Sequence, residues 1–303
     1  MDIRYGRKRN GIVRQLRGKL DEWVDSIDDE EVQKALRKDT IVTGGAIASM
    51  LLGEKVNDYD LYFRTKETTK LVAQYYVDKF NARRALESVN DYKPEVRELD
   101  GGRIGIWLQS AGVAAEEQEH YSYFETLDPQ QAEDFAESLL QREEEEKEPY
   151  RPVFMSENAI TLSDKVQLVI RFYGEPDEIH DNYDFLHATC YYDYSDNHLE
   201  LPAAALECLL SRTLVYRGSL YPVASIFRMK KFIERGWRIT AGQQLKIMWQ
   251  ISALDLGQYD VLREQLTGVD MAYMYQLIEA LKDVEYDKIN SAYVAKIIDK
   301  IFE

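Results

Sequence analysis

Residues 40–63 read TIVTGGAIASMLLGEKVNDYDLYF, and this stretch is the most informative part of the chain. Its pattern predicts an apolar strand, a turn at Gly44 and Gly45, a short helix, a polar loop, and a second strand that opens with Asp58-Tyr59-Asp60. Glycine has no Cβ atom, so the backbone at the turn can bend sharply and approach a ligand closely. The N–H groups at the start of the following helix then face the turn, which makes it a natural seat for phosphate.

Two carboxylates lie two residues apart at the start of the second strand. Side chains of a strand alternate between its two faces, so Asp58 and Asp60 project from one face. Two like charges held this close are costly unless a cation lies between them. Carboxylate oxygens that hold Mg²⁺ beside a triphosphate are a known solution for phosphoryl transfer. Gly-Gly and Asp-x-Asp are each commonplace alone, and it is their conjunction that predicts a metal and nucleotide site.

The same residues resemble the active-site signature of the DNA polymerase β-like nucleotidyltransferases, which is GG or GS, a helix, and then [DE]-x-[DE]. The variant with Ala46, Leu51-Leu52-Gly53 and Asp58-Tyr59-Asp60-Leu61 is most similar to the head domain of poly(A) polymerases and tRNA CCA-adding enzymes. Those typically show GGxVRDxLLGxxxxDxDL. Here Ile47-Ala48-Ser49 replaces V-R-D, so the arginine and aspartate of the CCA type are missing. The chain is most similar to a phage-encoded branch, closely over residues 40–64 and loosely over 153–240.

The composition is that of a globular protein, with 303 residues, 45% of them apolar and 12% aromatic. There is neither a signal peptide nor an apolar run of membrane-spanning length, and Cys190 and Cys208 are not at metal spacing. We therefore expect a cytoplasmic protein (in the host cytoplasm if a phage encodes it) with no membrane partner. The net charge of −16 argues against a surface that binds nucleic acid throughout, and we expect no binding to duplex DNA.

The pattern along the chain predicts an α+β fold. We expect a nucleotidyltransferase-type mixed sheet with flanking helices in a catalytic domain over residues 1–200, and an all-α domain over residues 201–303. An acidic insertion is expected at about residues 111–150, with one helix at 130–140. Other helices are expected at 11–38, 67–85, 202–214, 222–235, 241–254, 258–266, 270–284 and 288–302. A hairpin is expected around Asp100-Gly101-Gly102, and further strands at 153–155, 159–162, 165–172 and 182–194.

Members of the resembled family generally add a third acid from a neighbouring strand to complete a two-metal site. The segment KVQLVIRFYGEPDEIHDNYDFLHATCYYD resembles a form in which an F-D pair supplies that acid, and Tyr183-Asp184 occupies its position. By strand parity Asp184 would share a face with Leu186, Ala188 and Cys190. An acid at the start of a strand is, however, often only a solvated strand end.

A basic helix is the second candidate for nucleotide binding. Arg228, Lys231 and Arg235 recur at three- and four-residue steps, so they form a stripe that could hold the β- and γ-phosphates. Tyr216 or Tyr221 could stack on the base. A solvated helix face that pairs with the abundant acids is an equally good interpretation, and Trp237 is expected to be a packing residue.

The resemblance implies a metal-dependent nucleotidyltransferase that transfers NMP from an NTP to an acceptor hydroxyl, with an RNA 3′ end slightly favoured. Asp58, Asp60 and Asp184 would be the catalytic and metal-binding residues, with Mg²⁺ or Mn²⁺. Gly44, Gly45, Arg228, Lys231 and Tyr221 would bind the nucleotide. Two alternatives are a toxin- or defence-type nucleotidyltransferase that modifies tRNA or protein, and a non-catalytic nucleotide-binding or virion-associated protein with the same fold.

Overall fold

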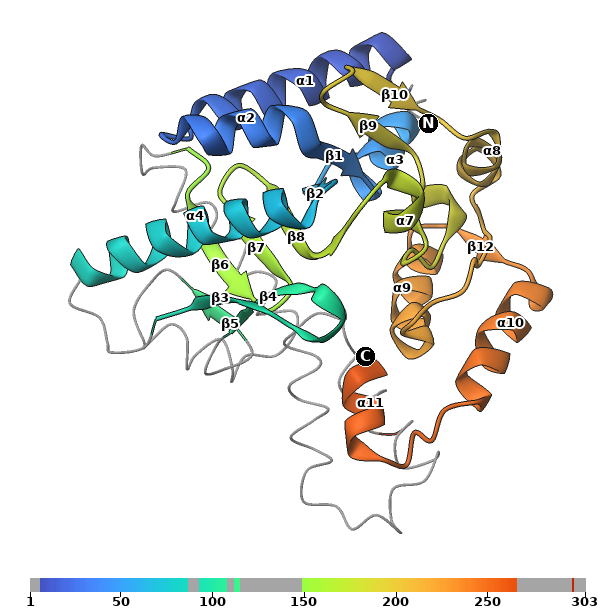
Figure 1. Ribbon diagram of the computed structural model, residues 1–303. Coiled ribbons are helices and arrows are strands. Elements are labelled where there is room, and N and C mark those ends of the chain that lie inside the picture. The colour runs from blue at the N-terminus through green and yellow to red at the C-terminus, as the bar shows by residue number, and fades with distance from the viewer. Residues whose placement is uncertain (1–5, 87–92, 108–111, 115–148, 266–295, 297–303) are drawn as a thin grey trace. The chain divides into compact units, whose positions relative to one another are not determined.

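The structure is a computed structural model that describes residues 6–86, 93–107, 112–114, 149–265 and 296 (Figure 1). The described residues form two compact units. The first unit comprises residues 6–86, 93–107, 112–114, 149–181 and 187–210. The second comprises residues 182–186, 211–265 and 296. The domain boundary after residue 200 stays a prediction.

The first unit is built on a mixed sheet, which has eight strands within the described residues. In spatial order, the strands are β10 (His198–Glu200), β9 (Tyr191–Asp193), β1 (Thr40–Thr43), β2 (Tyr59–Phe63), β8 (Val166–Tyr173), β7 (Ala159–Leu162), β6 (Pro152–Ser156) and β5 (Gly112–Ala114). Strands β2 and β8 run parallel, whereas the other neighbouring strands run antiparallel. On β8 buried and partly exposed positions alternate from Val166 to Arg171, so one face of this strand is packed and the other is more open.

Helices α1 (Arg9–Asp25), α2 (Glu30–Asp39) and α4 (Lys66–Leu86) form a layer on one face of this sheet (Figure 1). The indole N–H of Trp23 on α1 donates to the hydroxyl of Tyr76 on α4 at 2.8 Å, which links the two helices. The amide of Gln15 donates to the hydroxyl of Tyr59 on β2 at 2.6 Å. The helix layer therefore covers the face that carries Tyr59, and Asp60 projects from the other face.

The N-terminal helical region is divided in two, whereas the sequence predicted one helix over residues 11–38. The second helix begins at Glu30 because Asp29 caps it: the Asp29 carboxylate accepts hydrogen bonds from the N–H groups of Glu31 and Val32 at 2.8 and 3.1 Å. Such a cap satisfies N–H groups that have no partner within the helix, so it favours a new helix start at this point.

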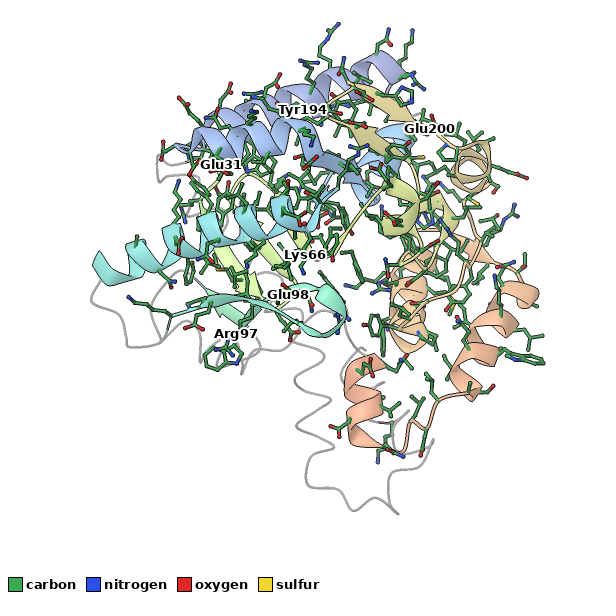
Figure 2. The ribbon with its side chains drawn as sticks, viewed as in Figure 1. Glu31, Lys66, Arg97, Glu98, Tyr194 and Glu200 are labelled. Atoms are coloured by element: carbon green, nitrogen blue, oxygen red, sulfur yellow. The ribbon has the colours of Figure 1, made fainter. Side chains whose placement is uncertain are left out.

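The predicted hairpin around Asp100-Gly101-Gly102 is confirmed. Strands β3 (Glu95–Glu98) and β4 (Ile104–Trp107) pair antiparallel on either side of this turn. Two contacts involve the strand β3, and Figure 2 labels Glu98, Lys66 and Arg97. Glu98 forms an ion pair with Lys66 at the start of α4. The guanidinium carbon of Arg97 lies over the ring of Trp107, 4.1 Å from the ring centroid. The ion pair attaches the hairpin to the helix layer.

The prediction of a strand over residues 182–194 is wrong for most of its length. Only Tyr191–Asp193 joins the sheet, while Leu186–Ala188 forms a short 3₁₀-helix. The backbone of residues 184–186 instead pairs with residues 215–217, through Arg217 N–H to Asp184 O at 2.8 Å and Leu186 N–H to Val215 O at 3.0 Å. Aromatic residues suggested a strand here, but Phe185 packs against the rings of Tyr216 and Phe232 instead.

The second unit is mostly helical in its described residues. It contains α9 (Pro222–Glu234), α10 (Ala241–Ser252), α11 (Tyr259–Gln265), and a short parallel pair of β11 (Thr213–Leu214) and β12 (Arg238–Ile239). Trp237 is buried against Phe232, with ring centroids 5.5 Å apart, which confirms its expected packing role. The Tyr216 hydroxyl donates to Gln250 at 2.5 Å, so this buried side chain fixes α10 to the loop before α9.

The prediction of an α+β fold with a mixed sheet and a helical C-terminal region is confirmed. Helix α8 (Ala203–Ser211) begins the helical part, as expected near residue 202. The predicted helices at 130–140 and 270–284 lie outside the described residues, as do nearly all of the acidic insertion and all of the predicted helix at 288–302 except Lys296, which is helical. None of the helices in the described ranges combines the length and apolar character that crossing a membrane requires.

Candidate functional site

The site predicted from residues 40–63 lies in the first unit, where β1, β2 and β8 run side by side. Thr43 pairs with Asp60 across the β1–β2 ladder, and Asp60 pairs with Gln167 across the β2–β8 ladder. Paired residues of neighbouring strands project from the same face of a sheet. Thr43, Asp60 and Gln167 therefore form one row on the face opposite the helix layer. Asp58 comes just before β2 and has the same parity as Asp60.

The two glycines have different roles in the turn that follows β1. Gly44 adopts φ 91° and ψ −144°, a conformation that other residues rarely reach, and its N–H donates to the carbonyl of Ala188 at 3.2 Å. Gly45 has no positive φ and begins helix α3 (Gly45–Leu52). A Cβ atom on Gly45 would meet no atom of the described residues within 4 Å. Gly44 therefore makes the turn, and Gly45 leaves the N-terminus of α3 open to a ligand.

A buried hydrogen-bond network holds the end of β1. The Thr43 hydroxyl donates to the carbonyl of Cys190 at 3.0 Å and lies 2.7 Å from Nε2 of His180. A hydroxyl has one proton, so its bond to Cys190 leaves the oxygen to accept a hydrogen bond from the Nε2–H of His180. His180 ends the short helix α7 (Pro176–His180) and is itself buried. Because Gly44 follows Thr43 directly, this network also holds the glycine turn.

The two aspartates are electrostatically coupled. Asp58 is exposed and Asp60 half-buried, although the carboxyl groups themselves lie among many neighbouring atoms. Burial, together with the negative charge of Asp58, raises the pKa of Asp60 to about 8. Burial also raises the pKa of Asp58. Within the described part of the chain, no Lys or Arg side chain forms an ion pair with either carboxylate.

This donor set fits a divalent cation. Carboxylate oxygens are the ligands that Mg²⁺ prefers, and a bound cation would offset both the burial and the repulsion that raise these pKa values. No group of three or more His, Cys, Asp or Glu side chains that could hold a metal is found among the described residues. The carboxylates available in the first unit for a metal at this site are therefore Asp58 and Asp60.

Asp184 lies in the second unit, where it already has a partner. Its side chain is buried and forms an ion pair with Arg228 of α9. The parity argument that placed Asp184 on a strand face is wrong, because residues 184–188 form a bend and a 3₁₀-helix rather than a strand. Its assignment as the third metal ligand stays a prediction.

The predicted basic stripe lies on α9, which starts with Pro222 as expected. Arg228 is partly buried with Asp184, whereas Lys231 is exposed. Tyr221 precedes the helix, and its carbonyl accepts a hydrogen bond from the N–H of Ser225 at 3.1 Å. The pairing of Arg228 supports the interpretation of this face as ion-paired, at least at this residue, and nucleotide binding by Lys231 and Tyr221 stays a prediction.

Sequence reasoning missed Gln167, Thr43 and His180. The signal for Gln167 was present, because it is one of only two polar residues in the apolar run VQLVIRFY. Its partner on the neighbouring strand could not be known without the register. The contact of Thr43 with His180 joins residues 137 positions apart, and no local pattern predicts such a pair.

The raised pKa of Asp60 predicts how stability depends on pH. The folded state binds the Asp60 proton more tightly than the unfolded state does, so its ionisation costs folded-state stability. Without divalent metal, we expect the free energy of unfolding to fall as pH rises from about 4 towards 8, and Asp60→Asn to show a flatter profile. Chemical denaturation across that range measures both. The variant Asp78→Asn, which removes an exposed carboxylate on α4, is the control, and identical slopes for all three proteins would contradict the prediction.

The two glycines predict opposite outcomes on substitution. Gly44→Ala forces a Cβ atom into a positive-φ conformation, and we expect a loss of about 1–3 kcal/mol in stability. Gly45→Ala meets no steric obstacle, so stability should be unchanged or slightly higher. The new methyl group would, however, fill the space at the start of α3 and weaken NTP binding. Thermal unfolding and calorimetric NTP titration separate the two effects. Equal loss of stability in both variants would be inconsistent with this division of roles.

Comparison with solved structures finds tRNA CCA-adding enzymes. The chain is 12% identical to the Thermotoga maritima enzyme complexed with tRNA, covering 88% of this chain and 54% of that one with a TM-score of 0.38. It is 11% identical to the Bacillus stearothermophilus enzyme in complex with CTP, covering 86% and 51% with a TM-score of 0.39. A third CCA-adding enzyme, in complex with CTP, gives 13% identity, coverage of 100% and 54%, and a TM-score of 0.44.

The chain thus spans about half the length of these enzymes. At such low identities and TM-scores, the similarity does not identify an activity. The tRNA and CTP in the solved structures are ligands of those enzymes alone. No curated protein matches the sequence. The family model described as "Gad2: Gabija anti-defense 2 family protein" matches residues 14–212, which include the strand, glycine turn, helix and aspartate pair. With about two thirds of its length matched, the chain belongs to the Gabija anti-defense 2 family.

Proposed function

We propose that this chain is a metal-dependent nucleotidyltransferase that transfers NMP from an NTP to an acceptor hydroxyl. One observation carries the proposal: the Thr43–Asp60 pairing puts the glycine turn and the N-terminus of α3 beside the coupled aspartates. A helix N-terminus favours an anion, whereas two close carboxylates favour a cation. A complex of a divalent cation with a triphosphate satisfies both demands, and neither a free phosphate nor a free cation does so alone.

Each residue then has a defined task. The open N–H groups at the start of α3 bind phosphate oxygens, and Gly45 admits them because it has no side chain. Asp58 and Asp60 hold Mg²⁺ or Mn²⁺, which when bound neutralises phosphate charge and lowers the pKa of an attacking hydroxyl. The acceptor oxygen forms a bond to the α-phosphorus, the bond from that phosphorus to the β-phosphate oxygen breaks, and pyrophosphate leaves.

Asp184 is proposed as the acceptor of the hydroxyl proton and as a third carboxylate. Its ion pair with Arg228 makes the two proposed roles depend on each other. Asp184 can bind a cation, and Arg228 a phosphate, only after this ion pair has separated. Arg228, Lys231 and Tyr221 would then be available to the β- and γ-phosphates and the base.

Family membership bears on the biological role. The family is named for action against the Gabija defence, which supports a role for the transfer reaction in overcoming that defence. An RNA 3′ end is the acceptor favoured by the sequence. The second candidate is a toxin- or defence-type nucleotidyltransferase that modifies a tRNA or a protein, and the link of the family to a defence system is the reason to test it. A non-catalytic protein of the same fold would bind metal and nucleotide without transferring label.

The reaction is tested with each α-³²P-labelled NTP, Mg²⁺ or Mn²⁺, and either total RNA or protein lysate. We expect label to enter one acceptor fraction, and Asp60→Ala to reduce transfer by more than about a hundredfold because a direct metal ligand is lost. Asp78→Ala, on the surface of α4, controls for the loss of one carboxylate. Near-full transfer by Asp60→Ala would refute the assignment of the site. Binding of NTP with no label in any fraction would support the non-catalytic alternative.

A further inference from the structure

Gln167 is a polar residue of β8 that lies next to the aspartate pair. It lies on β8 directly across from Asp60, on the same face of the sheet, and is half-buried. Within the described residues, its amide group has no hydrogen-bond partner. An amide without a partner, one strand away from two carboxylates, is placed to contact whatever those carboxylates bind.

Neither strand beside β2 supplies a third acid. Strand β1 reads TIVT and β8 reads VQLVIRFY, and these are the two neighbours of β2 in the sheet. Two acids of other strands share the Asp60 face, and both are unsuitable. Asp193 on β9 is ion-paired with Arg64 at 2.6 Å. Glu200 lies on β10, three strands from β2, which is about 14 Å away at the usual strand spacing.

The charge of this row limits what it can bind. When both are ionised, Asp58 and Asp60 carry two negative charges, which one divalent cation balances. Without nucleotide, a second divalent cation would leave two uncompensated positive charges at close range, and such like-charge repulsion is strong in a partly buried site. A third carboxylate would reduce that excess, but the position across from Asp60 holds a neutral amide instead.

We propose that the site in the first unit holds a single divalent cation, and that Gln167 is the residue that sets this number. The inference rests on the proposed function and deepens it. The Gln167 amide offers a carbonyl oxygen towards the cation and N–H groups towards a phosphate oxygen, whereas a carboxylate would repel the phosphate. Gln167 thus contributes to binding one cation with its triphosphate and adds no negative charge of its own.

A Mn²⁺ titration of the full chain without nucleotide, with free Mn²⁺ counted by electron paramagnetic resonance, tests the proposal. We expect the wild type to bind one Mn²⁺ and Asp60→Asn to lose it. Gln167→Glu should bind two, because a third carboxylate supports a second cation. Gln167→Asp provides the same charge on a shorter side chain if the first variant does not fold. Gln244→Glu, on the exposed surface of α10, adds the same charge elsewhere and should still bind one.

The remaining outcomes separate this inference from the proposed function. Two Mn²⁺ ions in the wild type, reduced to one by Asp184→Asn, would overturn the single-cation site and leave the nucleotidyltransferase proposal standing with Asp184 as its third ligand. One Mn²⁺ in wild type, Gln167→Glu and Gln167→Asp alike would overturn the role of Gln167. No Mn²⁺ in folded wild type would overturn the metal site itself, and with it the proposed function.

Discussion

The pairing of Thr43 with Asp60 is the constraint on which the site depends. Because β1 and β2 are antiparallel in this register, the strand end that leads into the glycine turn lies next to the aspartate. A shift of one residue would send Asp60 to the face covered by α1, α2 and α4, away from Thr43 and the glycine turn. The burial of Tyr59 and Leu61 under that helix layer fixes the register and so keeps Asp60 on the opposite face, beside Thr43.

Once the register is fixed, the electrostatics of the site follow. The N-terminus of α3 favours negative charge, and the coupled aspartates favour positive charge, where the end of β1 lies beside the start of β2. The raised pKa of Asp60 reflects burial first and the neighbouring carboxylate second. A site with these two preferences stores unfavourable energy when empty, and a cation together with an anionic ligand relieves it. Functional sites often contain such unfavourable arrangements of charge, which would not be expected if stability were the only requirement.

In the second unit, an ion pair limits the ability of the basic residues on α9 to bind phosphate. Arg228 has the helical spacing of a phosphate-binding stripe, but its guanidinium is held by the buried carboxylate of Asp184. An Arg–carboxylate pair with one partner buried is costly to separate, since separation leaves a buried charge uncompensated. Any ligand that recruits either residue must offset that cost. The same pair secures the 182–186 segment to α9 within the second unit.

The sequence alone determined the elements of residues 40–63, helix α4, the 95–107 hairpin and the helical C-terminal region, because each depends on local periodicity or turn chemistry. It also determined that Gly44 and the aspartates belong to one motif. The tertiary structure alone decided that Gln167 faces Asp60, that His180 holds Thr43, and that residues 184–188 leave the sheet. Each of these depends on pairing between distant segments, and aromatic residues such as Phe185 suit a strand and a packed bend equally well.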